Sequence, residues 1–184
     1  MRAEEDPLGP SPAWTVFDQR ASIYDAWYDT PEGAALFAAE VETLRPLLAG
    51  LPRPWLEAGA GSGRFIAALG AQVGVDPARA PLAIAARLGV AAVQAVAERL
   101  PVRAASCGAV LFVVALSFVA DPMAALREAR RVLAPRGAVI IGEVPASSPM
   151  GKRYRAMGAA GPPFYHQARF FTPEALAGLL AASG

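Results

Sequence analysis

The sequence predicts an α/β fold, in which a doubly wound, mostly parallel sheet carries helices on both faces. Two observations lead to this prediction. Short apolar strands alternate with helical segments through most of the 184 residues, and a glycine-rich turn joins the first strand to the next helix. This alternation is typical of parallel sheets, because the chain needs a crossover to begin each strand at the same end of the sheet. At this length a single domain is expected.

The chain divides into an N-terminal part and a core. Residues 1–13 are rich in proline and acids and predict a flexible arm. Residues 14–50 predict a helical segment whose aromatic first half lies over a pocket or over the core. Pro46 predicts that the main helix of this segment ends near Arg45. The remaining residues, 51–184, are expected to form the sheet and its helices.

The pattern of apolar residues places the elements of the core. Five strands are predicted, at residues 54–58, 72–75, 90–94, 109–115 and 138–143. Helices are predicted at residues 64–69 and 78–88, from Asp121 and Pro122 onward, and from Thr172 onward. Residues 145–171 show no clear periodicity and are expected to be irregular. Right-handed crossovers then place ligand sites at the carboxyl ends of the strands.

The turn after the first strand has the composition of a ligand-binding loop. The strand ends in Glu57, and glycines follow at Gly59, Gly61 and Gly63. Glycines let a ligand approach the backbone closely, and the N-terminal amides of the next helix attract a carboxylate. A dinucleotide-binding turn has the pattern G-x-G-x-x-G, which here would place its third glycine at Arg64. The observed G-x-G-x-G spacing therefore disfavours a nicotinamide cofactor.

A second motif lies at the end of the next strand. The residues Gly74-Val75-Asp76-Pro77 place a carboxylate beside the glycine loop. That carboxylate is able to accept hydrogen bonds from both hydroxyls of a ribose. An aspartate before proline is also a common cap for the following helix, and the two roles are compatible. Two motifs at consecutive strand ends together indicate a nucleoside ligand.

The motifs in their order resemble those of class I S-adenosylmethionine-dependent methyltransferases, which have a Rossmann-like fold. They are E-A-G-A-G-S-G at residues 57–63, G-V-D-P at 74–77, A-E-R-L-P at 97–101 and L-A-P-R-G at 133–137. The resemblance covers most of residues 14–184. It is strongest to the small-molecule branch that includes the ubiquinone-biosynthesis-like methyltransferases, where a segment similar to residues 24–28 helps to close the cofactor pocket.

This resemblance implies S-adenosyl-L-methionine as the cofactor and S-adenosyl-L-homocysteine as its product. It implies that the glycine loop holds the methionine moiety, that Asp76 holds the ribose, and that residues 96–100 lie against the adenine. The implied cofactor contacts are Glu57, Gly59, Ala60, Gly61, Gly63, Asp76, Pro77, Ala97, Glu98, Ala115, Tyr24 and Tyr28. Bonding to loop amides remains an alternative role for Glu57, and the role of a solvated acid next to an ordered turn remains one for Glu98.

Three departures from the family pattern matter. Val96 stands where the family often has an aspartate that bonds to adenine, and residues 115–119 replace a segment that commonly bears a histidine. No sequence follows Gly184 to form the antiparallel hairpin that usually ends the sheet. We therefore expect either a truncated chain, which is favoured, or an exposed sheet edge. An exposed edge favours pairing with a second chain, and a homodimer is one such assembly.

The implied reaction is direct transfer of a methyl group to a small-molecule acceptor. The enzyme has mainly to align a nucleophile behind the methyl group, with no metal. If the nucleophile must lose a proton, the candidate catalytic bases are His166, which is the only histidine, and Glu143. Two alternatives remain open: a non-catalytic S-adenosylmethionine-binding protein and a nicotinamide-dependent reductase.

Composition excludes several other classes of function. The formal net charge is +1, and residues 152–155 are the only dense basic stretch, so a nucleic-acid partner is not expected. Cys107 is the only cysteine, which excludes an internal disulfide and a cysteine-built metal site. The longest apolar run, at residues 109–120, is shorter than the roughly 20 residues of a membrane helix. Because no secretory signal is visible, we expect a cytoplasmic protein without a membrane partner.

Overall fold

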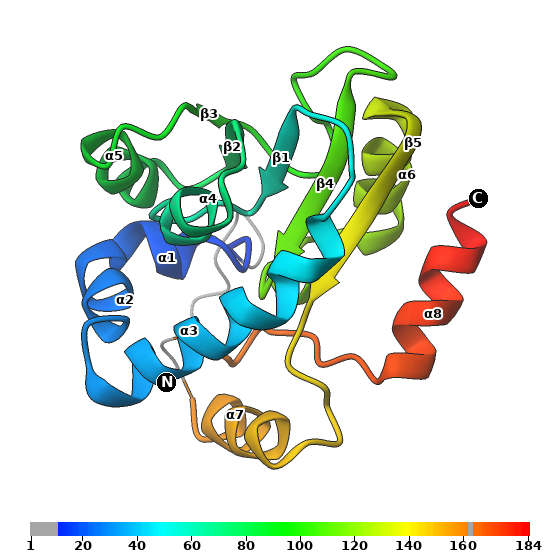
Figure 1. Cartoon of the computed structure of the whole chain (residues 1–184). Coiled ribbons are helices and arrows are strands. Elements are labelled where there is room, and N and C mark those ends of the chain that lie inside the picture. The colour runs from blue at the N-terminus through cyan, green and yellow to red at the C-terminus, as the bar shows by residue number, and fades with distance from the viewer. Residues whose placement is uncertain (1–10, 162–163) are drawn as a thin grey trace.

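The computed structural model describes residues 11–161 and 164–184. The predicted arm at residues 1–13 therefore lies outside the described residues, except for residues 11–13. In the described part, five parallel strands form one sheet with helices on both of its faces (Figure 1), which confirms the predicted α/β fold.

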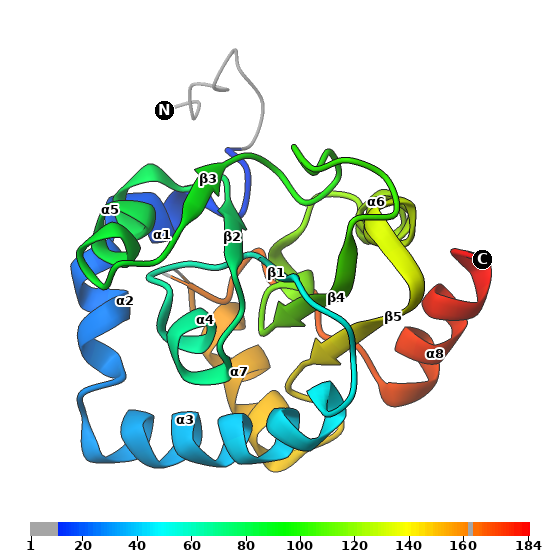
Figure 2. The ribbon, with the colours of Figure 1, turned by 45° about the horizontal axis from the view of Figure 1, so that its top comes forward.

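The order of the strands locates the expected binding edge. The strands are β1 (Trp55–Ala58), β2 (Val73–Asp76), β3 (Ala92–Gln94), β4 (Cys107–Val113) and β5 (Leu133–Gly142). Figure 2 shows them side by side in the order β3-β2-β1-β4-β5. After β3 the chain returns past β1 to begin β4, so the winding of the sheet reverses beside β1. In such sheets ligands bind at this reversal, outside the carboxyl ends of the strands.

The two faces of the sheet have separate apolar cores. On one face α3 (Pro31–Leu44) and α4 (Arg64–Leu69) pack against the sheet, and on the other α6 (Pro122–Val132) packs, with α8 (Pro173–Ala182) outside it. All seven residues of β4 are buried. Its side chains alternate between the faces, as the pleat requires: Phe112 lies in the α6 core and Leu111 in the α3 core. Burial on both sides explains why β4 is apolar throughout.

Several predicted element boundaries are confirmed. The α4 helix has the predicted bounds, and α5 (Arg79–Arg87) and β2 differ from prediction by about one residue at each end. The α3 helix ends at Leu44 and continues as one 3-10 turn, η1 (Arg45–Leu48), as expected from the proline inside that turn. The side chain of Asp121 accepts a hydrogen bond from the Ala124 amide and so caps α6.

Two expectations for the second half of the chain are wrong. Residues 145–171 are not irregular throughout, because they contain α7 (Pro149–Ala159), which the Ser148 side chain caps. Apolar periodicity does not reveal this helix, since only Gly151 and Tyr154 in it are buried. The last strand also begins five residues earlier than residue 138, because a register shift against β4 accommodates the predicted turn inside β5.

The N-terminal segment is fastened to the helices that follow β1 and β2. It forms α1 (Thr15–Gln19) and α2 (Ala21–Trp27). Arg64, at the start of α4, forms ion pairs with Asp25 at 2.7 Å and Asp29 at 2.9 Å. The side chain of Asp18 accepts a hydrogen bond of 2.7 Å from the Ala80 amide of α5. These polar contacts hold the segment over the carboxyl edge of the sheet.

The last strand, β5, lies at one edge of the sheet. Among the described residues, no strand pairs with the outer side of β5, and none forms an antiparallel hairpin with it. Within the described ranges, no helix combines the length and the apolar character needed to cross a membrane.

Glu57, the penultimate residue of β1, is a buried acid. Its side chain is 1% exposed, and its Oε2 atom has no hydrogen-bond partner among the described residues. Burial raises the pKa of this carboxyl well above its usual range, and the nearby charge of Asp76 raises it further. The folded protein therefore keeps a proton on Glu57 at pH values where the unfolded chain loses it.

Substituting Gly63 tests the close packing between the glycine loop and α5. Gly63 has φ +82°, and an added Cβ would lie 2.9 Å from the Cβ of Ala85, whereas Gly89, with φ +74°, has open space around it. We predict that Gly89→Ala lowers the free energy of unfolding by about 1 kcal/mol, from the left-handed backbone alone. For Gly63→Ala we predict a further loss of about 1–3 kcal/mol in the free energy of unfolding, because the added Cβ overpacks against Ala85. Equal losses for both variants in urea unfolding would contradict the proposed packing.

Glu57→Gln tests the buried proton. An acid whose pKa is raised by folding makes the protein less stable as pH rises above the pKa of the unfolded chain, near 4.3 for glutamate. We predict that the variant gains stability relative to the parent as pH rises above that value, by at most about 1.4 kcal/mol per pH unit. Chemical unfolding at several pH values measures this difference. A difference that stays constant with pH would show that Glu57 is ionised in the folded protein.

Candidate functional site

A first pocket lies at the carboxyl edge of the sheet, where the winding reverses. Its walls come from the loops after β1, β2, β3 and β4 and from the N-terminal segment. The residues that line it are Trp14, Phe17, Tyr24, Gly59, Gly61, Asp76, Pro77, Val96, Ala97, Glu98, Val113, Val114, Ala115, Phe118, Val119 and Ala120. Apolar side chains thus surround a small number of polar groups, as is usual for small-molecule sites.

The glycine loop forms the floor of this pocket. The amides of Gly59 and Ala60 both donate to the carbonyl of Val75 in β2, which ties the loop to the neighbouring strand. An added Cβ at Gly59 would lie 2.4 Å from the Cβ of Ala115, so only glycine fits there beside the exit of β4. An added Cβ at Gly61 would lie 3.4 Å from the ring of Tyr24 and would project into the pocket. The missing side chain at Gly59 thus makes room for Ala115, and the one at Gly61 leaves space in the pocket.

Asp76 is the polar centre of the pocket. Its Oδ2 accepts a hydrogen bond of 2.8 Å from the Gly61 amide, and its Oδ1 accepts one of 2.8 Å from the Ala78 amide. The residue is 8% exposed; burial raises the pKa of its carboxyl, and the two amide bonds partly offset this effect. Each carboxylate oxygen has two lone pairs, so each retains one acceptor site. Asp76 therefore fixes the loop and still has two positions for ligand hydroxyls.

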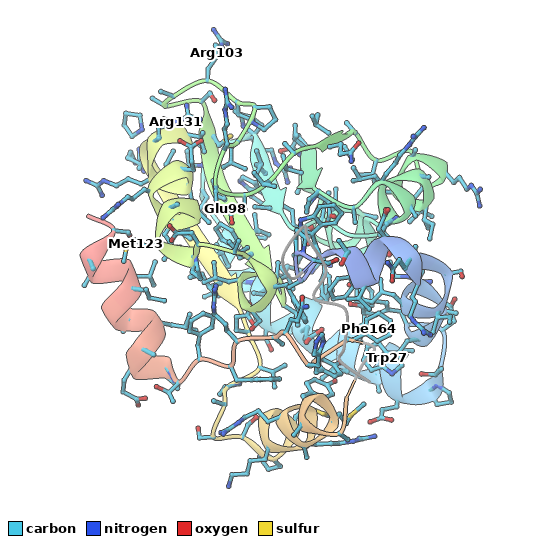
Figure 3. All side chains as sticks on the ribbon, turned by 180° about the vertical axis from the view of Figure 1, so that it is seen from behind. Trp27, Glu98, Arg103, Met123, Arg131 and Phe164 are labelled. Carbon is cyan, nitrogen blue, oxygen red and sulfur yellow. The ribbon has the colours of Figure 1, made fainter. Side chains whose placement is uncertain are left out.

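The loop after β3 forms the third side of the pocket. Ala97 is buried and Glu98 lines the wall, with its Oε1 accepting a hydrogen bond of 3.0 Å from the Asp121 amide at the start of α6. Figure 3 labels Glu98 beside this helix. Val96 also lines the pocket and is 39% exposed. Glu98 thus both binds the start of α6 and lines the pocket wall.

Aromatic side chains of the N-terminal segment, together with Phe118, form the remaining wall of the pocket. The hydroxyls of Tyr24 and Tyr28 lie 3.1 Å apart, and Phe17 packs edge-on against both Tyr24 and Phe118. Burial raises the pKa of Tyr24 and of Tyr28, so both phenols stay neutral. This cluster separates the first pocket from a second one.

The second pocket lies between α2, α3 and α7 and has a volume of about 540 Å³. It shares four wall residues with the first pocket: Phe17, Tyr24, Val114 and Phe118. Its remaining walls include the Tyr154 and Tyr165 rings, which stack with centroids 4.3 Å apart, and Glu32, Leu36 and Glu40 on one face of α3. The common wall makes the two pockets neighbours.

The structure brings most of the predicted cofactor contacts to the first pocket. Those that line it are Tyr24, Gly59, Gly61, Asp76, Pro77, Ala97, Glu98 and Ala115. The others do not line it: Glu57, Ala60 and Gly63 lie in or below the loop, and Tyr28 lines the second pocket. Among the described residues, the Ala60 amide bonds to Val75, Gly63 packs on α5, and the Tyr28 hydroxyl lies 3.1 Å from that of Tyr24. In the part of the chain that the structure describes, the Oε2 atom of Glu57 does not make the bond to loop amides that the sequence left open.

The two candidate bases lie outside both pockets. His166 is exposed and borders a separate surface hollow with residues of the N-terminal segment. Glu143 accepts hydrogen bonds from the Ser117 amide at 3.0 Å and from the Ser117 hydroxyl at 2.8 Å, which holds the turn after β4. No group of histidine, cysteine or acidic side chains able to hold a metal occurs in the described ranges.

Sequence reasoning missed several pocket residues. Trp14 and Phe17 belong to the aromatic segment that was expected to cover a pocket, but spacing alone gave no reason to choose them. Phe118 and Val119 lie in the stretch that replaces the family's histidine-bearing segment. Glu40 was not identified; the available signal was an acid next to the apolar positions of a helix.

Comparisons with known proteins agree with this geometry. The family of the methyltransferase domain matches residues 56–141. A S-adenosylmethionine-dependent methyltransferase of Thermotoga maritima, described as a possible histamine N-methyltransferase, is 33% identical, with a TM-score of 0.85 over 94% of this chain and 80% of that one. DhpI, solved with S-adenosylmethionine, is 26% identical, with a TM-score of 0.67 over 91% of this chain and 85% of its own.

Curated relatives have no described activity. An uncharacterized protein of Mycobacterium tuberculosis is 44% identical over 173 residues, which are 94% of this chain. The chain spans 61% of the length of that relative. An uncharacterized protein of Methanocaldococcus jannaschii is 31% identical over 92% of this chain and 80% of its own length. With the fold, the glycine loop, Asp76 and the Thermotoga maritima relative all in agreement, the chain belongs to the class I S-adenosylmethionine-dependent methyltransferases.

Proposed function

We propose that this chain binds S-adenosylmethionine in the first pocket and transfers its methyl group to a small molecule held in the second. The observation that carries the proposal is the wall common to both pockets, formed by Phe17, Tyr24, Val114 and Phe118. For direct transfer, the methyl group and the acceptor would have to meet through this wall.

The first pocket suits the proposed cofactor. Gly61 leaves space that a side chain would fill, and Asp76 retains two acceptor positions for the ribose hydroxyls. Ala97 and Glu98 lie where the adenine is expected, and Glu98 has a second carboxylate oxygen for its amino group. When bound, the cofactor supplies an electrophilic methyl group on a sulfonium. The residues of the chain then have only to bind, orient and exclude water.

The second pocket supports a small-molecule acceptor. Its volume of about 540 Å³ falls within the usual range for small-ligand pockets, roughly 300–1,000 Å³. Aromatic rings on three helices line it and restrict how an acceptor lies. A non-catalytic binding protein has no need of this adjoining space, so the pocket favours catalysis. His166 has no part in the proposal, because it lines neither pocket.

Substitution of Asp76 tests the ribose contact. We predict that Asp76→Ala weakens binding of S-adenosylhomocysteine by about 1–3 kcal/mol, because the hydroxyls lose their buried acceptors. Isothermal calorimetry measures the affinity, and circular dichroism verifies folding. Glu42→Ala, on the exposed side of α3, removes a carboxylate without touching a pocket and serves as the control. A folded Asp76→Ala variant with unchanged affinity would refute the ribose assignment.

The choice of cofactor gives a second test. We predict that the protein binds S-adenosylhomocysteine and shows no measurable binding of NADH. The physical reason is Arg64, which occupies the place of the third glycine and is held there by ion pairs to Asp25 and Asp29. Calorimetric titration with each compound compares the two directly. Comparable affinity for NADH would favour a reductase instead.

A further inference from the structure

The second pocket contains a carboxylate that lacks an ion-pair partner. Glu32, Glu40 and Arg153 are the charged residues of its wall. Arg153 pairs with Glu32 at 2.7 Å, and no cation pairs with Glu40 in the part of the chain that the structure describes. With Glu32 paired to Arg153, Glu40 is left as the acid of this wall without a cationic partner among the described residues.

Ionised Glu40 is unfavourable in the empty pocket. Burial raises the pKa of its carboxyl to about 7, and the neighbouring charge of Glu143 adds to this effect. Partial burial takes the carboxylate out of water without supplying a compensating charge. A cation placed in the pocket would remove this cost, because a buried charge is stabilised by a hydrogen-bonded partner of opposite sign.

The other walls of the pocket are also suited to a cation. Trp27, Tyr28 and Phe164 join the stacked rings of Tyr154 and Tyr165 around it. Figure 3 shows Trp27 and Phe164 on the same side of the molecule, although they come from α2 and from the segment after α7. Aromatic faces attract ammonium groups electrostatically and also pack against apolar carbon.

We propose that the second pocket selects a methyl acceptor that carries a protonated amine on an apolar body, with Glu40 as the counter-ion of the amine. The ammonium nitrogen has no lone pair, so it anchors the acceptor while another atom of the acceptor receives the methyl group. Aromatic rings surround the apolar body, and the Glu40 carboxylate binds the charged end. An anionic acceptor would face an unpaired carboxylate, and a neutral one would leave Glu40 uncompensated. This inference rests on the proposed function, because it names the acceptor class of the same pocket.

The proposal makes binding depend on pH in a defined direction. The groups facing Glu40 or lying near it are Glu32, Tyr28, Arg153, Tyr154, Tyr165 and Glu143. Ammonium binds to the ionised form of Glu40, so amine affinity rises as pH increases through about 7, where the carboxyl loses its proton. Amine affinity levels off about one pH unit above that value, once the carboxyl is fully ionised, and falls where the amine itself deprotonates, near pH 10 for an alkyl amine such as lysine.

Three matched probes test the inference. Protein saturated with S-adenosylhomocysteine is titrated calorimetrically with 2-phenylethylamine, 2-phenylethanol and phenylacetate, at about pH 6 and about pH 8. We expect the amine to bind about tenfold more tightly than the alcohol at the higher pH, with phenylacetate weakest. The advantage of the amine over the alcohol should shrink at the lower pH.

Two variants test whether Glu40 causes the preference for the amine and its pH dependence. Glu40→Gln should remove the preference for the amine and its pH dependence, whereas Glu42→Gln, the same change on the exposed side of α3, should keep both. Retained binding of S-adenosylhomocysteine shows that each variant is folded. Equal binding of the three probes, tightest binding of phenylacetate, or an amine preference that survives Glu40→Gln would overturn the inference and leave the proposed function intact. Failure of S-adenosylhomocysteine to bind would instead refute the proposed function.

Discussion

The bonds of one carboxylate organise the binding edge of this protein. Asp76, at the end of β2, accepts the amide of Gly61 with one oxygen and the amide of Ala78 with the other. It thereby joins the loop after β1 to the start of α5, while the loop amides of Gly59 and Ala60 bond to β2. The floor of the first pocket is thus fixed before any ligand arrives, which reduces the entropy lost on binding.

The sequence predicts this part of the molecule well, because local chemistry determines it. Glycines that need positive φ, a strand that ends in an acid, and an aspartate before proline each have a local signature, and parallel pairing then brings them together. Capping residues identify α6 and α8 for the same reason. Within the glycine loop, however, the spacing of the glycines does not show which of them packs against a neighbouring helix and which faces the ligand pocket. Gly63 packs on α5, while Gly61 opens the pocket.

The acceptor side is harder to predict because it depends on contacts between distant segments. The α7 helix has no apolar stripe, since most of its residues are exposed or line a pocket. The pocket position of Glu40 depends on the rings that α2 and α7 place around it. Its raised pKa depends on burial and on Glu143, about a hundred residues later in the chain. His166 shows the opposite case: its residue type suggested catalysis, and its position in the fold sets it apart from both pockets.

In the proposed function, the two pockets hold the donor and the acceptor of one reaction. A crystal structure with S-adenosylhomocysteine tests this most directly. We expect the ribose hydroxyls on the carboxylate of Asp76, the adenine beside Ala97 and Glu98, and the sulfur facing the wall shared with the second pocket. A ligand whose ribose lies away from Asp76, or whose sulfur points away from that wall, would contradict it.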